Sequence, residues 1–158
     1  LGSPNTGKST LMNALTKQDT SIVHDLPGAT RDAVGARVNC AGLVLDLFDL
    51  PGFRDSEDGI EQEAISIAKN IAKEATLTIL IADDKHEWLN TNGIDMTSIK
   101  VATKADCHKR DDADICISAH TGENMQQLAV LIRDAIVPAD VLQDEGPWFF
   151  TGYSPTEE

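Results

Sequence analysis

The sequence predicts an α/β fold in which helices cover both faces of an open, mostly parallel β-sheet. Three observations predict it. Continuous apolar runs, which are typical of buried parallel strands, recur at residues 77–82, 99–103 and 115–118. Segments whose apolar residues have helical spacing alternate with these runs and follow the last of them. A glycine-rich motif of the kind that binds phosphate stands immediately before the first predicted helix.

The other elements follow in chain order. Residues 8–16 form a short helix, and a long polar stretch separates it from the first strands. Residues 34–40 and 43–49 are two strands on either side of Ala41-Gly42, which predicts an antiparallel hairpin. Residues 60–75 and 122–136 are amphipathic helices, and the second of these closes the domain.

Two features indicate a reduced version of this fold. The connections at 84–97 and 107–113 are short, although a parallel crossover usually needs a dozen residues or more. The first barely holds one helix and the second holds none. A phosphate-binding loop also normally follows a buried strand that aims it, and here only Leu1 precedes the loop. We therefore expect the first, central strand to be missing.

Composition is that of a soluble protein with one compact domain. Of the 158 residues, 41% are hydrophobic and 25% are charged. We expect a domain at 1–136 and a carboxyl-terminal tail at 137–158. The net charge of −13 argues against a broad contact with a phosphate backbone, so any RNA contact needs other domains or partners. The sequence holds no long apolar run and no cysteine spacing typical of a metal site, which predicts a cytoplasmic protein that has no membrane partner.

The motif with the most chemical content is the glycine-rich loop. It fits G-x-x-x-x-G-K-[ST] and reads Gly2-Ser3-Pro4-Asn5-Thr6-Gly7-Lys8-Ser9. In such a loop the backbone N–H groups turn inward around phosphate oxygens, and the next helix points its positive end at them. Lys8 is expected to reach the β- and γ-phosphates, and the Ser9 hydroxyl to ligate Mg²⁺. The expected nucleotide contacts of the loop are Asn5, Thr6, Gly7, Lys8, Ser9 and Thr10.

A second motif ends the hairpin. Asp49-Leu50-Pro51-Gly52 fits D-x-x-G and stands where a nucleotide triphosphatase places an aspartate that holds Mg²⁺, usually through water. The backbone N–H of Gly52 is expected to contact the γ-phosphate. Asp49 and Ser9 are therefore predicted to share one magnesium ion.

Two further motifs follow the last two predicted strands and point to a guanine base. Thr103-Lys104-Ala105-Asp106 places a carboxylate where it can accept hydrogen bonds from guanine N1–H and N2–H₂, a donor pair that adenine lacks. The stem of Lys104 can cover the base face. The next motif, Ser118-Ala119-His120, offers the backbone N–H of Ala119 to guanine O6. The motifs therefore predict that the chain binds GTP and GDP.

Together these motifs resemble the G domain of the MnmE (TrmE) tRNA-modification GTPases, in the superfamily that also holds the Era and Der GTPases. The resemblance covers residues 2–136. It rests on G-x-P-N-x-G-K-S-T-L-M-N-A-L, on Pro27-Gly28-Ala29-Thr30-Arg31-Asp32, and on D-x-x-G followed by Phe53-Arg54-Asp55. It implies a P-loop GTPase that hydrolyses GTP with Mg²⁺ and acts as a conformational switch.

The resemblance also implies roles for single residues. Thr30 resembles the switch threonine that completes Mg²⁺ coordination, and Glu61 stands where the family has a glutamate that orients the attacking water. Asn5 resembles the asparagine that binds K⁺. Phe53 replaces the glutamine of many GTPases, so K⁺, ordered when two G domains pair as a homodimer, is implied to supply the missing charge. The catalytic candidates are Lys8, Thr30, Gly52 and Glu61.

The sequence also departs from the family pattern, and alternatives stay open. Thr103 stands where an asparagine is usual, and its hydroxyl can donate only one hydrogen bond. One alternative is an ATP-dependent kinase or ATPase on the same phosphate-binding loop. Others are an Era- or Der-like ribosome-assembly GTPase, and a nucleotide-binding module without turnover, which the missing strand and the altered base motif favour.

Overall fold

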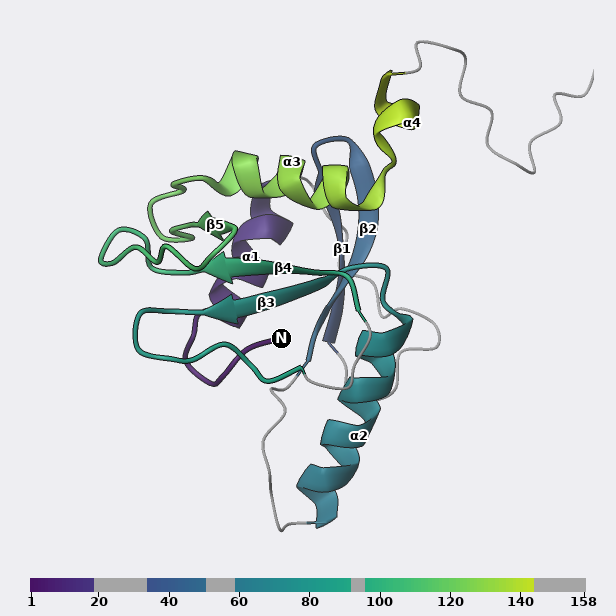
Figure 1. Ribbon diagram of the computed structural model, residues 1–158, viewed down its shortest axis with the longest axis vertical. Coiled ribbons are helices and arrows are strands. Elements are labelled where there is room, and N and C mark those ends of the chain that lie inside the picture. The colour runs from purple at the N-terminus through teal and green to yellow at the C-terminus, as the bar shows by residue number, and fades with distance from the viewer. Residues whose placement is uncertain (19–33, 51–58, 92–95, 144–158) are drawn as a thin grey trace, which may run out of the picture.

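The computed structural model describes residues 1–18, 34–50, 59–91 and 96–143 of the chain. Figure 1 shows the arrangement of the helices and strands in these residues. In chain order they are α1 (Lys8–Gln18), β1 (Val34–Cys40), β2 (Leu43–Asp49), α2 (Gly59–Glu74), β3 (Thr78–Ala82), β4 (Ser98–Ala102), β5 (Ile115–Cys116), α3 (Met125–Ile136) and α4 (Ala139–Gln143).

The strands form two sheets. β3, β4 and β5 pair in parallel in that order, with Thr78 opposite Ser98 and Val101 opposite Ile115. β1 and β2 pair antiparallel along their full length around the turn at Ala41-Gly42. The predicted α/β class and the predicted hairpin are confirmed. Within the described residues, the parallel sheet has three strands, and the hairpin forms a separate two-stranded sheet.

Helices lie on both faces of the parallel sheet, as predicted. On one face, Leu15 of α1 and Leu128 of α3 belong to a buried cluster that includes Ile81 of β3. On the other face, Ala72 of α2 belongs to a cluster that includes Leu80. Leu80 and Ile81 point in opposite directions because successive strand residues alternate. The apolar run of β3 is therefore explained by burial on both sides.

Most elements lie within one or two residues of their predicted bounds, and two, β5 and α3, are at least two residues shorter than predicted. β5 ends at Cys116, although the N–H of Ile117 still donates to the carbonyl of Ala102 at 2.8 Å, and the N–H of Ser118 donates to the carbonyl of Glu123 at 3.1 Å. α3 begins at Met125 because Gly122 and Asn124 have left-handed φ angles of 83° and 58°, which interrupt a helix. None of the described helices is both long enough and apolar enough to cross a membrane.

The amino terminus pairs with β3. The Leu1 amino group donates to the carbonyl of Ile79 at 2.8 Å, and the Leu1 carbonyl accepts from Ile81 N–H at 2.7 Å. Gly2 forms a parallel bridge with Ile81. Leu1 and Gly2 therefore hold the phosphate-binding loop at the carboxyl end of β3.

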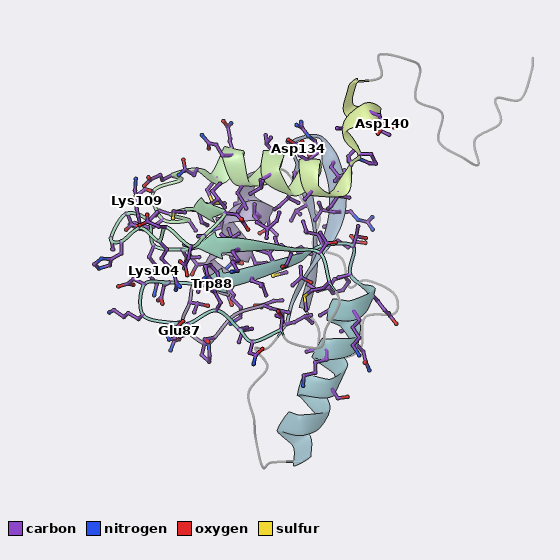
Figure 2. All side chains as sticks on the ribbon, viewed as in Figure 1. Glu87, Trp88, Lys104, Lys109, Asp134 and Asp140 are labelled. Atoms are coloured by element: carbon purple, nitrogen blue, oxygen red, sulfur yellow. The ribbon has the colours of Figure 1, made fainter. Side chains whose placement is uncertain are left out.

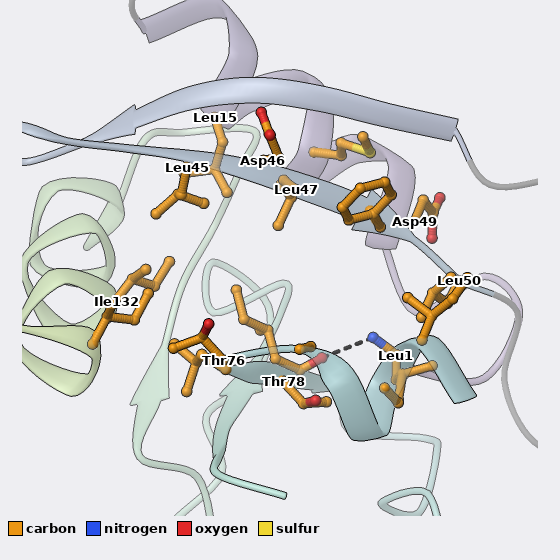
Figure 3. Close-up of a pocket in the computed structure, with 18 of the residues that line it drawn as sticks. Leu1, Leu15, Leu45, Asp46, Leu47, Asp49, Leu50, Thr76, Thr78 and Ile132 are labelled. Atoms are coloured by element: carbon orange, nitrogen blue, oxygen red, sulfur yellow. Dashed lines mark hydrogen bonds between the residues drawn. The ribbon is translucent and has the colours of Figure 1, made fainter. Parts of the chain in front are cut away.

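A largely apolar cavity lies next to this pairing. It has a volume of about 780 Å³ and is lined by residues of β2 and β3, by Leu1, and by residues of α1, α2 and α3. Figure 3 shows Leu45 and Leu47 of β2 on one side of the cavity and Thr78 on another. Burial lowers the pKa of the Leu1 amino group to about 6, because the charged form is poorly solvated there.

Candidate nucleotide-binding site

The phosphate-binding loop runs from the bridge with Ile81 to the start of α1. A Cβ atom at Gly2 would collide with the carbonyl of Ile81, so only glycine allows this close approach. Gly7 has a φ of 88° and Asn5 a φ of 62°, both in the left-handed region. The fully buried Thr6 donates its hydroxyl to the carbonyl of Ser3 at 2.7 Å. The loop is thus held by its own hydrogen bonds.

Lys8 curls back over this loop. Its Nζ donates to the carbonyl of Gly2 at 2.9 Å and to that of Ser3 at 3.0 Å. The ammonium therefore lies inside the curve of the loop. This is the position from which a lysine can meet phosphate oxygens.

The two predicted magnesium ligands are neighbours. The Ser9 hydroxyl at the start of α1 donates to Oδ2 of Asp49, at the end of β2, at 3.2 Å. Both supply oxygen, and Mg²⁺ is usually bound by one or two protein oxygens together with waters and phosphates. The pair therefore fits a nucleotide-bound magnesium ion. In the described residues no group of three or more His, Cys, Asp or Glu side chains forms a separate metal site.

The base-binding motif contacts the phosphate-binding loop directly. The buried Thr103 donates its hydroxyl to the carbonyl of Thr6 at 2.6 Å. Lys104, with a φ of 62°, donates Nζ to the carbonyl of Asn5 at 3.1 Å. Thr103 therefore makes one tie to the loop with the single donor that a hydroxyl has.

Asp106 and the motif after β5 meet at the same edge of the sheet. A hydrogen bond from the Ser118 hydroxyl lowers the pKa of Asp106, and nearby His120 contributes in the same direction. The exposed Asp106 carboxylate is therefore an acceptor at neutral pH, as a guanine site requires. Ala119 packs partly against the core.

The structure does not describe several other predicted site residues. Thr30 and Gly52 lie outside the described residues, as does Phe53. Glu61 belongs to α2, but its side chain is not among those described. Thr10 is exposed in the first turn of α1. The catalytic roles of Thr30, Gly52 and Glu61 stay predictions.

Sequence reasoning missed Asp83. Its side chain is fully buried, and its Oδ2 accepts from Lys104 Nζ at 2.6 Å. Asp83 follows β3 directly, at the edge where the strands of such sheets bind ligands. A carboxylate immediately after the buried run 77–82 was the available signal.

The comparisons with known proteins agree with this geometry. A model of the family described as "50S ribosome-binding GTPase" matches residues 1–118. The chain is 39% identical over 148 residues to a tRNA modification GTPase MnmE of Acidiphilium cryptum, covering 93% of this chain and 34% of that protein. It is 35% identical to the MnmE of Sinorhizobium medicae, covering 84% of this chain and 32% of that protein. The chain thus spans about a third of the length of these curated relatives.

Solved structures show the same fold. The G domain of the T. maritima FeoB iron transporter superposes with a TM-score of 0.60 at 26% identity, over 85% of this chain and 94% of that domain. The FeoB cytosolic domain in its GMPPNP form superposes with a TM-score of 0.62 at 23% identity, over 98% of this chain and 67% of that one. The second likeness shows the fold alone. By the family match over residues 1–118, the chain belongs to the 50S ribosome-binding GTPase family, and it is a G domain of the MnmE (TrmE) type.

Proposed function

We propose that this chain binds guanine nucleotide and hydrolyses GTP to GDP and phosphate, as a switch domain of MnmE type linked to tRNA modification. One observation carries the proposal. The phosphate-binding loop, the Ser9–Asp49 oxygen pair and the Lys104–Asp106 base motif lie along a single edge of the molecule and are joined by hydrogen bonds. The MnmE relatives support the link to tRNA modification.

The described residues bind and orient the nucleotide. Lys8 would exchange the carbonyls of Gly2 and Ser3 for phosphate oxygens, and so neutralise charge that grows as the γ-phosphate leaves. Ser9 and Asp49 would hold Mg²⁺. When bound, the ion supplies positive charge to the phosphate oxygens. Asp106 would accept the two guanine donors, which makes ADP a poor competitor.

The catalytic step is proposed for Thr30 and Gly52, which lie outside the described residues, and for Glu61, whose side chain is not described. Glu61 would orient the attacking water, while Thr30 and the N–H of Gly52 would contact the triphosphate end. Asn5 would bind K⁺, as the resemblance to MnmE-type G domains implies. In this proposal two G domains pair and order the K⁺ site. If GTP turnover proved equal in K⁺ and in Na⁺, the potassium part would be wrong.

The function is tested by turnover with matched variants. We expect GTP hydrolysis in the presence of Mg²⁺, and Lys8→Ala and Asp49→Asn should each lower kcat by about 10²-fold or more, the usual cost of losing one group that stabilises transition-state charge. Asp46→Asn is the control, because Asp46 lies on the same strand but pairs with Arg37 away from the loop. Turnover that survives both site substitutions would contradict the proposal.

An Era- or Der-like role in ribosome assembly is the second candidate. The description of the matched family, "50S ribosome-binding GTPase", favours it. Co-sedimentation with 50S subunits in GTP, and its absence in GDP, would support this role over the MnmE-like one.

A further inference from the structure

One buried carboxylate takes part in neither the proposed phosphate contacts nor the proposed base contacts. Asp83 stands at the carboxyl end of β3, and its side chain has an exposed fraction of 0%. A carboxylate in such a place needs partners that replace its water. Asp83 has three of them: Lys104 Nζ at 2.6 Å, His86 Nδ1 at 2.5 Å and the backbone N–H of Lys85 at 3.1 Å.

These partners keep Asp83 ionised. Burial by itself raises the pKa of Asp83, but hydrogen bonds from Lys104, His86 and the Lys85 amide together hold it well below its usual value. Because the carboxylate accepts from His86, Nδ1 of that ring carries the proton. A negative charge is thus fixed beneath the base-binding motif.

The charge holds Lys104 in one place. Lys104 Nζ lies between Oδ2 of Asp83 and the carbonyl of Asn5 at 3.1 Å, so its stem spans from the end of β4 to the phosphate-binding loop. The Lys104 side chain is still 46% exposed. One side of the stem is therefore open to cover a base, and its rotamer freedom is lost before any nucleotide arrives.

The segment that carries Asp83 is itself braced. Arg110 Nη1 donates to the carbonyls of Asp83 at 2.8 Å and of His86 at 2.6 Å. The Arg110 guanidinium lies 4.7 Å from the centre of the Trp88 ring, and Trp88 Nε1 donates to Asp112 at 2.7 Å. In Figure 2, Trp88 and Lys104 are labelled on the same side of the view. These bonds join the two short connections that follow β3 and β4.

We propose that Asp83 is a positioning residue of the nucleotide site, which holds Lys104 across the phosphate-binding loop so that the lysine stem is ready to cover the guanine base. The inference rests on the proposed function. It adds a residue that acts through Lys104 and sets how long a guanine nucleotide stays bound. The carboxylate touches neither the base nor the phosphates.

The first test measures the contact without any nucleotide. Lysines of the full chain are acetylated with limiting acetic anhydride, and the rate at each lysine is read by mass spectrometry. Lys104 should react at least tenfold more slowly than Lys109, a difference much larger than that between their exposed fractions of 46% and 72%. Asp83→Asn should speed the labelling of Lys104 at least fivefold, and Asp84→Asn should leave it unchanged. Equal rates at Lys104 and Lys109 would overturn the proposal, whether or not the chain binds GDP.

The second test is a double-mutant cycle on GDP affinity. Asp83→Asn and Lys104→Met should each raise the Kd for GDP about tenfold, mainly through faster release, and the double variant should match Lys104→Met within twofold. The KM for GTP should rise with them while kcat changes less than twofold. If the increases in Kd of the two single variants multiplied in the double variant, Asp83 would not act through Lys104. An unchanged Kd for GDP in Asp83→Asn would also contradict the proposal.

Two further variants separate positioning from simple loss of structure. Asp112→Asn removes an acceptor of Trp88 and Arg110 without touching Lys104, so it should lower stability but leave the Kd for GDP within twofold. Asp83→Glu keeps the charge and moves it by one methylene, so it should give a Kd between those of the wild type and Asp83→Asn. If Asp83→Asn does not fold, the Asp83→Glu result decides: an unchanged Kd would count against the proposal.

Discussion

At the scale of single residues, the contact between Thr103 and Thr6 explains how the chain tolerates an altered base motif. A hydroxyl can donate one hydrogen bond, and Thr103 gives it to the carbonyl of Thr6 at 2.6 Å, with the carbonyl of Ala82 further away at 3.3 Å. Thr6 and Thr103 are both buried. The threonine therefore keeps the mechanical link between the base motif and the phosphate-binding loop.

Thr103→Val tests that link. Valine has the same shape but no donor, so the buried Thr6 carbonyl loses its short hydrogen bond. We expect the free energy of unfolding in urea to fall by about 1–3 kcal/mol, the usual cost of an unsatisfied buried polar group. Thr97→Val, at an exposed position just before β4, is the control and should change stability by less than about 0.5 kcal/mol. Equal effects of the two variants would mean that the hydroxyl is unimportant.

Asp83 predicts a pH dependence with a definite sign. Its pKa in the folded chain lies below the ordinary value of 3.8, so its ionised form stabilises the fold above that pH and the stabilisation is lost as pH falls further. Asp83→Asn has no carboxyl group at this position, so it has no such stabilisation to lose as pH falls. The difference in unfolding free energy between wild type and Asp83→Asn should therefore shrink below pH 3.8, by at most about 1.4 kcal/mol per pH unit. Urea titrations at pH 6 and pH 3 measure it, and a difference that stays constant would exclude this linkage.

At the scale of elements, local signals were enough where one residue type decides the geometry. Ala41-Gly42 predicts the β1–β2 hairpin, and both residues have positive φ angles, of 52° and 93°. The apolar run at β3 predicts burial on two faces, and both faces are covered. The P-loop motif predicts the position of Lys8, because the pattern itself fixes the loop. These parts of the fold and site could be predicted without coordinates.

Other parts depend on contacts between distant segments and could not be predicted. The bond from the N–H of Ser118 to the carbonyl of Glu123, which follows the short β5, joins two segments of the loop before α3 and has no signal in the sequence. Asp83 looks like an ordinary polar residue after a strand until Lys104 and Arg110, which lie far along the chain, are placed beside it. The cavity between β2 and β3 likewise depends on how distant elements pack and has no signal in the sequence.

That cavity predicts how an added strand would behave. Five β-branched residues joined ahead of Leu1 should fill the space alongside β3, and a peptide N–H would replace the buried Leu1 amino group. Burial of apolar side chains gives about 1.5–3 kcal/mol each, against an ordering cost of about 1–2 kcal/mol per residue. We expect a net gain of a few kcal/mol in the free energy of unfolding.

The control for this prediction is an extension of equal length made of Gly and Ser. It supplies the same peptide N–H next to Leu1 but no apolar side chains. If both extensions changed the unfolding free energy equally, the cavity would not be acting as a strand site.

At the scale of the whole molecule, charge limits what the chain can bind. With a net charge of −13, the domain repels a polyanion over most of its surface. We expect no tRNA binding by this chain at micromolar concentration and physiological salt, measured by filter binding. Raising the salt should not change that result. Tight binding that weakens steeply with salt would show a basic contact surface that this account does not contain.

The guanine nucleotide site is tested most directly by calorimetric titration of the chain with GDP and ADP in the presence of Mg²⁺. We expect GDP to bind and ADP to bind at least about 10²-fold more weakly, because Asp106 matches a donor pair that adenine lacks. Asp106→Asn should weaken the binding of GDP and strengthen the binding of xanthosine diphosphate, since the amide can donate to the carbonyl that xanthine carries at C2. Equal affinity for GDP and ADP, or no heat with GDP at millimolar concentration, would contradict the account.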